Sequence, residues 1–435
     1  MEEPIINVGV LTAPKIDFIL LSTYNFNNEE VSGPQTVECR DGKILWAGKL
    51  YDELLFTPRF AATDSFELIA VTIGIKFHWE RKENQRFLGS LKIIVDDKDK
   101  LTAINCISIE DYLTSVISSE MSATASLELL KAHAVISRSW VLSNISHQKD
   151  STTSEMCIES KDGYVKWYDR QAHTRFDVCA DDHCQRYEGI TRISTPTVKQ
   201  AIVSTYGEAL TYKGEICDAR FSKCCGGIFE EFQNCWENKP YSYLHKKRDS
   251  LSVNWVPNLK REEDADKWIR STPDSFCNTK SKEVLSQVLN NYDQETTDFY
   301  RWKVDYSQSE LSSIIREKSG IDFGDVIDLI PVERGTSGRL VRLKILGTKK
   351  TMTIGKELEI RRLLSKSHLY SSAFVVDKIG ADEKGVPAKF VLTGAGWGHG
   401  VGLCQIGAAM MGAQGFTYDE ILQHYFRGVR IEKLY

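Results

Sequence analysis

The spacing of apolar residues divides the chain into a strand-rich beginning and a mixed remainder. Between residues 5 and 110, runs of β-branched and aromatic residues such as IINVGVL, GKILWAG and LGSLKIIVDD are separated by Gly, Asn and Asp. This is the pattern of short strands joined by turns. Helical and strand patterns alternate after residue 110. We therefore expect an α+β protein with mixed sheets, in which an N-terminal β-rich region at residues 1–105 precedes a helical core at residues 106–435.

Two helices are predicted at the start of that core. Ser108 and Ser126 are placed to cap them, because a serine hydroxyl accepts a backbone N–H that the first helical turn leaves unpaired. Apolar residues cover most of the second helix, so it is predicted to be buried. Glu120 lies where the first helix ends, and Arg138 lies inside the second, where a guanidinium needs a partner. The pair indicates an acidic site and a basic residue that supports it.

A glycine-rich stretch near the C-terminus, LTGAGWGHGVGLCQIGAAMMGAQG, has the composition of a loop that lines a binding groove. It is not a nucleotide loop: no register gives G-x-G-x-x-G, and G-K-S/T occurs nowhere in the chain, so no nucleotide cofactor is expected. Gln405 to Ala413 are predicted to form a helix. Thr417 and Glu420 predict a capping box for another helix after it.

A cluster of histidine and cysteine residues indicates a metal site. His173, Cys179, His183 and Cys184 fall within a dozen residues, and these types surround structural zinc ions. No Cys-x-x-Cys pair is present, so a turn with buried cysteines and exposed histidines is the alternative. Cys179 and Cys184 are the better candidates, and which histidine completes the set stays open. Such a site would be structural, holding a long loop against the Glu120 region.

Composition and charge narrow the function classes. The formal net charge of −5 gives no basic face for nucleic acid. No apolar run approaches the roughly 18 residues that cross a bilayer. The N-terminus lacks the features of a secretory signal, so the compartment stays open. Eleven cysteines are an odd number, and their clustering favours thiols and a metal site over a disulfide framework. Residues 250–300 are charged and contain no motif that indicates a catalytic, binding or metal site, so we expect a variable insertion there.

Several motifs resemble those of the stage II sporulation protein D (SpoIID)/LytB family, the amidase enhancers. YLTSVISSEM followed by LELLKAHAVISRSWVL is similar to the family's YLxGVVxxEMP segment and EALKAQAVAARTYA helix. The glycine-rich stretch is similar to GxGxGHGVGMSQxGA, with Cys404 in place of Ser. Cys225 likewise stands where FxxxSGGxTE has Ser, and His133 replaces a Gln. Ser122 replaces a Pro, and Ala125–Ser126 replace Trp-Pro. The resemblance covers nearly the whole chain and implies a SpoIID-like fold.

The resemblance also implies an activity. In that family the Glu of EM is the catalytic residue of a lytic transglycosylase that cleaves peptidoglycan glycan strands, which is Glu120 here. Candidate substrate-binding positions by the same resemblance are Lys131, Arg138, Gln185, Trp397, His399 and Gln405. The segment around Cys179, His183 and Cys184 is similar to one that binds zinc in some members. Expected partners are glycan strands and an N-acetylmuramoyl-L-alanine amidase, and the expected location is the cell envelope or periplasm.

Other readings of these residues remain. The protein could be a non-catalytic glycan-binding module that assists an amidase. A cysteine hydrolase using Cys404 with His399 is less favoured, because such sites usually recruit a distant histidine. From pattern alone Glu120 is a solvated helix-end carboxylate, His399 a residue that bonds to backbone in a glycine turn, and Cys224 and Cys225 core residues.

Overall fold

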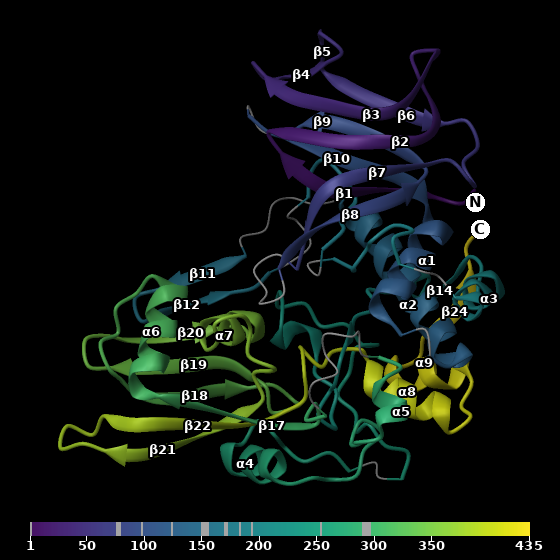
Figure 1. Cartoon of the computed structure of the whole chain (residues 1–435). Coiled ribbons are helices and arrows are strands. Elements are labelled where there is room, and N and C mark those ends of the chain that lie inside the picture. Colours follow the sequence, from purple (N-terminus) through teal and green to yellow (C-terminus); the bar gives the residue numbers. More distant parts are fainter. Residues whose placement is uncertain are drawn as a thin grey trace.

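The computed structural model describes residues 2–74, 80–96, 99–122, 125–148, 156–168, 173–181, 184–192, 195–252, 255–288 and 297–435. These residues form helices and mixed sheets, which confirms the predicted α+β class (Figure 1). The helices are α1 (Ile109–Glu120), α2 (Leu127–Gln148), α3 (Pro196–Ser204), α4 (Glu262–Arg270), α5 (Lys282–Leu285), α6 (Gln308–Ser319), α7 (Glu357–Leu363), α8 (Gln405–Ala413) and α9 (Tyr418–Tyr425).

The first ten strands form one large sheet at the top of Figure 1, which the short β13 extends. Along β2, Ile16, Phe18 and Leu20 are buried while Lys15 and Asp17 are exposed, the two-residue period of a sheet with one buried face. The strands are β1 (Ile5–Ala13), β2 (Lys15–Phe26), β3 (Glu29–Arg40), β4 (Lys43–Trp46), β5 (Lys49–Tyr51), β6 (Glu53–Pro58), β7 (Ser65–Ile73), β8 (Arg81–Leu88), β9 (Ser90–Val95), β10 (Leu101–Ser108) and β13 (Val178–Cys179).

Strand β10 leads directly into α1, and α2 is the central helix of the molecule. The Ser108 hydroxyl accepts the Asp111 amide at 3.3 Å, and Ser126 does the same for Leu129 at 3.4 Å, so both predicted caps are present. Helix α2 packs against α1, α3, α8, α9 and β14. Residues on every side of it are therefore buried, as its apolar sequence predicted.

The second half of the chain builds a separate apolar core at the lower left of Figure 1. One sheet has the order β11-β12-β20-β19-β18 and another the order β17-β22-β21, with α6 and α7 packed against them. The strands are β11 (Cys157–Ser160), β12 (Gly163–Lys166), β17 (Arg301–Ser307), β18 (Val326–Arg334), β19 (Leu340–Gly347), β20 (Thr351–Gly355), β21 (Phe374–Ala381) and β22 (Pro387–Ala395).

The C-terminal segment returns to the helical layer. Strand β23 pairs in parallel with β16, and β24 pairs with β14, which also carries β15. The predicted helix at Gln405–Ala413 and the Thr417–Glu420 capping box are both present. The strands are β14 (Glu208–Tyr212), β15 (Glu215–Ile216), β16 (Phe221–Ser222), β23 (Leu403–Cys404) and β24 (Arg430–Lys433).

Two further features concern the length of the helices and the limits of the domains. Among the residues that the structure describes, no helix has the length and apolar character needed to cross a membrane. The predicted division at residues 105 and 106 stays a prediction; β10 continues to Ser108 before α1 begins.

Candidate active site at the end of helix α1

Glu120 is the last residue of α1 and is half-buried. Its Oε1 accepts the backbone N–H of Arg186 at 3.1 Å, so the carboxylate holds the loop that follows Cys184. Burial, followed by the nearby Cys184 and Cys179, raises the pKa of Tyr112, and Glu120 adds to this rise. Glu120 is therefore bound to the protein backbone near a buried tyrosine instead of extending from the helix end as a freely solvated side chain.

The loop after Cys184 is fixed to the two helices by buried side chains. Tyr112 donates its hydroxyl to Gln185 Oε1 at 3.2 Å, and Gln185 Nε2 donates to the Ser137 carbonyl at 3.5 Å. The Glu188 amide donates to Ser115 Oγ at 3.2 Å. Gln185 is only 1% exposed, so the structure corrects its assignment to substrate binding: it anchors the loop that carries the Arg186 amide.

Three of the four predicted metal ligands come together beside Glu120. The ligand atoms of His173, Cys179 and Cys184 lie within 4.8 Å of one another, and all three residues are half-buried. One imidazole and two thiols are a donor set that suits zinc. The hydrogen bond with Cys179, followed by burial, raises the pKa of Cys184. His183, the fourth predicted ligand, lies outside the described residues.

Sequence reasoning missed Arg220, which lies between this cluster and the glycine-rich loop. Its charge opposes the rise in the pKa of Cys184, and its guanidinium stacks 4.3 Å from the Trp236 ring centroid. Its Nε donates to Asp218 Oδ1 at 2.8 Å, and its carbonyl accepts the Leu403 amide at 3.0 Å. The only sequence signal was a single basic residue entering a short strand, which is too common to single out.

His399 holds the glycine turn. Its Nδ1 accepts the Val401 amide at 3.0 Å, and its ring lies 4.8 Å from the Trp236 ring. Burial, followed by the charges of Arg220 and Arg339, lowers the pKa of His399 well below its usual value, while a hydrogen bond to the Phe221 backbone opposes that shift. These contacts favour the reading in which His399 is a neutral residue bonded to backbone.

The two other predicted groove residues differ in exposure. Trp397 is half-buried: its ring stacks on Tyr370, with centroids 4.2 Å apart, and lies 4.8 Å from the Phe299 ring. Gln405 is only 2% exposed, and its Nε2 lies 3.4 Å from His133 Nε2. Gln405 therefore belongs to the contact between α2 and α8 and does not face a groove, which corrects that prediction.

Two predicted basic residues are held by other partners. The Arg138 guanidinium is fully buried and binds both Glu110 oxygens, at 2.9 and 2.6 Å. Of the two predicted roles, positioning of substrate or of a loop, these contacts fit only the positioning of neighbouring protein segments, and sequence reasoning missed Glu110 as the partner. Lys131 Nζ lies 2.8 Å from Glu128 Oε1 and above the Tyr418 ring of α9. A role for Lys131 in substrate binding stays a prediction.

A cavity of about 410 Å³ lies between the N-terminal sheet and the loop that carries Arg186. Val71, Phe176, Cys179 and Arg186 are among its lining residues. It therefore adjoins the residue whose amide binds Glu120.

Two family models match the chain. The family model described as Stage II sporulation protein matches residues 97–212, which include Glu120 and the His173, Cys179 and Cys184 cluster. A domain of unknown function, DUF8618, matches residues 230–402, which include the first part of the glycine-rich stretch up to Gly402.

Several relatives match most of the chain at modest identity. Stage II sporulation protein D of Bacillus subtilis (strain 168) is 23% identical over 334 residues, which are 76% of each chain. The amidase enhancer of the same organism is 22% identical over 73% of this chain, but the match spans only 40% of that longer protein. An uncharacterized protein of Brachyspira hyodysenteriae is 25% identical over 79% of this chain and 72% of its own length. The chain thus contains a stage II sporulation protein domain at residues 97–212, and proteins named stage II sporulation protein D and amidase enhancer are similar to it at 22–23% identity.

Proposed function

We propose that the protein is a lytic transglycosylase that cleaves the β-1,4 bond between N-acetylmuramic acid and N-acetylglucosamine, with Glu120 as general acid and base. The observation that carries this proposal is the placement of Glu120. Glu120 is a half-buried carboxylate at the end of a buried helix. It accepts the backbone amide of Arg186, in a loop that hydrogen bonds fix to α1 and α2. Such fixed positioning is what a proton-transferring group requires.

One carboxyl group is enough for this reaction. The acid protonates the leaving glycosidic oxygen, the muramyl 6-hydroxyl closes on the anomeric carbon, and the resulting carboxylate takes up the hydroxyl proton. A hydrolase normally needs a second carboxylate to activate water or act as nucleophile. The half-buried Trp397 would offer an apolar face to a sugar ring.

A zinc ion held by His173, Cys179 and Cys184 would be structural. Its ligands belong to the segment that leads into Cys184, Gln185 and Arg186, so a metal there would fix the loop whose amide binds Glu120. The proposed substrate places the activity in the cell envelope, and the proposed partner is an amidase that removes stem peptides from the strands.

The test compares Glu120→Gln with Asp111→Asn, which removes a carboxylate from the exposed first turn of the same helix. Purified peptidoglycan, with and without prior amidase treatment, is digested and its sugar ends are analysed by mass spectrometry. Because general acid–base catalysis contributes about 100-fold or more, Glu120→Gln should lower the release of anhydro-muropeptides at least that much. Asp111→Asn should act like the unmodified chain. Unchanged release by folded Glu120→Gln protein would refute the proposal.

A non-catalytic amidase enhancer is the second candidate, supported by the name of the Bacillus subtilis relative. In that case the protein would bind glycan and accelerate an amidase without forming anhydro sugars, and Glu120→Gln would change neither effect. The cysteine-hydrolase reading loses its support, because Cys404 is fully buried and His399 Nδ1 already accepts the Val401 amide.

A further inference from the structure

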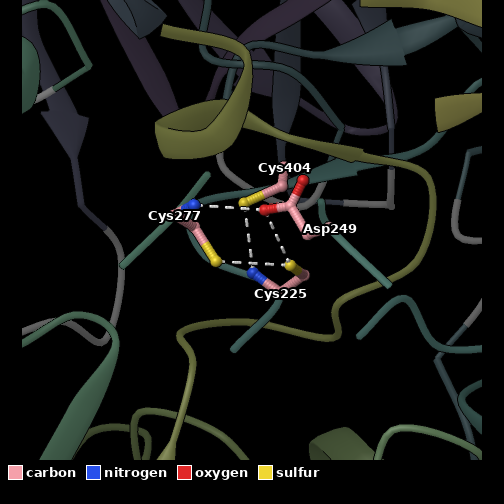
Figure 2. Close-up of side chains that lie close together, drawn as sticks. All are labelled: Cys225, Asp249, Cys277 and Cys404. Carbon is pink, nitrogen blue, oxygen red and sulfur yellow. Dashed lines mark hydrogen bonds between the residues drawn. The ribbon is translucent and has the colours of Figure 1, made fainter. Parts of the chain in front are cut away.

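Four buried side chains converge at the base of the glycine-rich loop (Figure 2). Cys225, Asp249, Cys277 and Cys404 come from four separate segments, and their ligand atoms lie within 4.8 Å of one another. Asp249, Cys277 and Cys404 are fully buried, and Cys225 is 2% exposed. The cluster is separate from the His173 group, which is half-buried beside Glu120.

The separations fit a tetrahedral metal site. Cys225 Sγ lies 3.5 Å from Cys277 Sγ and 3.5 Å from Asp249 Oδ2. Zinc–sulfur bonds of about 2.3 Å and zinc–oxygen bonds of about 2.0 Å give tetrahedron edges of about 3.8 Å between sulfurs and about 3.5 Å between sulfur and oxygen. All three cysteines are free thiols. The donors therefore already have nearly the spacing that one zinc ion would impose.

The surroundings hold these donors in place. Backbone amides point at two of the sulfurs, Cys225 N at Cys404 Sγ (3.2 Å) and Gly227 N at Cys225 Sγ (3.4 Å). Asp249 Oδ1 accepts the Tyr425 hydroxyl at 3.0 Å and faces His424 Nε2 at 3.2 Å, while Oδ2 lies toward the thiols. Hydrogen bonds of this outer kind orient metal ligands, and donors to sulfur and carboxylate also stabilise their anionic, metal-binding forms.

The cluster also brings four groups that can become anionic into one buried site. A buried site disfavours the charged forms of such groups, so an anionic set there needs a cation to compensate it. Of the cations close by, Arg339 donates its Nη1 to the Cys225 carbonyl at 3.0 Å, and Lys247 Nζ lies 3.1 Å from His424 Nδ1. A divalent ion would compensate the thiolates far better.

We propose that Cys225, Cys277, Cys404 and Asp249 bind one zinc ion in a closed structural site. Three thiolates and one carboxylate complete four-fold coordination, which leaves no position for substrate or water. Binding would release the thiol protons and couple the metal to folding. The ion would join four parts of the chain: the turn at Cys225, the segments of Asp249 and Cys277, and the N-terminus of α8 at Cys404.

Cys224 is the competing ligand. It is fully buried, and its pKa is raised by burial and by hydrogen bonds with Cys277 and Cys404, so its thiol lies near the same site. It is not one of the four residues whose ligand atoms share mutual distances within 4.8 Å. Cys224→Ser is therefore expected to keep the metal.

The first experiment counts zinc in the full chain by elemental mass spectrometry. Cys277→Ser should contain one zinc equivalent less than Cys217→Ser, a matched control because Cys217 is equally buried and lies outside the cluster. Glu120→Gln should retain the full content, so this result is independent of the proposed catalytic role. Equal zinc in the Cys277→Ser and Cys217→Ser proteins would overturn the proposal.

A second experiment identifies the ligands without relying on a core substitution at the new site. In a Cys179→Ser/Cys184→Ser protein, which lacks the ligands beside Glu120, X-ray absorption should show three sulfurs at about 2.3 Å and one oxygen at about 2.0 Å around zinc. Folded protein that contains no zinc would overturn the site, as would a disulfide among Cys225, Cys277 and Cys404. A shell of four sulfurs, or loss of zinc in Cys224→Ser, would overturn the assigned ligand set.

Discussion

His133 is a titratable side chain that burial keeps neutral. It is a residue of α2 that faces α8, with Nδ1 3.2 Å from Ser137 Oγ and Nε2 3.4 Å from Gln405 Nε2. Burial, followed by the charge of Lys223, lowers the pKa of His133 from 6.5 to about 3. In the unfolded chain the same ring takes up a proton near pH 6.5, so the folded state becomes less stable as the pH falls through that value.

His133→Gln, which restores the amide of the family motif, should reduce this pH dependence. Between about pH 7.5 and about pH 5.5 the unmodified protein should lose about 1.4 kcal/mol more unfolding free energy than the variant, because only its unfolded state gains the His133 proton. Urea unfolding at the two pH values measures the difference. Parallel losses in both proteins would contradict the assigned burial of a neutral ring.

At the scale of elements, a parallel pairing of two short strands fixes the glycine-rich loop. Phe221 and Ser222 of β16 pair with Leu403 and Cys404 of β23. Gly402, just before β23, has φ of 72°, and a Cβ there would lie 2.0 Å from the Arg220 carbonyl oxygen. Only glycine allows the backbone to pass this close to the residue that stacks on Trp236.

Gly402→Ala should therefore disrupt the loop, and Gly415→Ala is the matched control. Gly415 has a similar positive φ of 89°, but a Cβ would meet nothing within 4 Å. The control should cost about 1–2 kcal/mol of unfolding free energy through backbone strain alone. Gly402→Ala should cost clearly more and should weaken glycan binding, as measured by urea unfolding and pull-down with peptidoglycan. Equal costs would contradict the close approach.

At the scale of the whole molecule, one buried ion pair joins segments from both ends of the chain. Glu110 of α1 binds Arg138 of α2, and its Oε1 also accepts the Gly207 amide and the hydroxyl of Tyr435, the last residue. Near it, Ile109 donates its amide to the Pro4 carbonyl. The N- and C-termini accordingly lie close together beside the helical layer (Figure 1).

Glu110→Gln should destabilise the entire fold. Removing one partner leaves the Arg138 charge buried and uncompensated, which costs about 3–5 kcal/mol. Lys15→Gln is the comparison, because Lys15 and Glu38 form an exposed pair whose loss costs about 0–1 kcal/mol. Urea unfolding distinguishes the two, and similar small losses would show that the Arg138 charge finds another partner.

Much of this protein follows from short stretches of sequence. The Ser108 and Ser126 caps, the burial of α2, the β-strands of the N-terminal region and the proximity of Cys179 to Cys184 all depend on residues near one another in the chain. Local hydrogen bonding and the period of apolar residues are sufficient to predict such features. The position of Glu120 at a helix end was predicted for the same reason.

Only the tertiary structure decided which distant residues meet. Arg138 was predicted to need a partner, and Glu110 becomes that partner because α1 packs on α2. Gln185 and Gln405 are buried by residues distant in the chain, which the local spacing of apolar residues does not indicate. Cys225, Asp249, Cys277 and Cys404 span 180 positions of the chain, and each by itself has the pattern of a core or loop residue. Their convergence depends on how four segments fold around one point, which is a property of long-range packing.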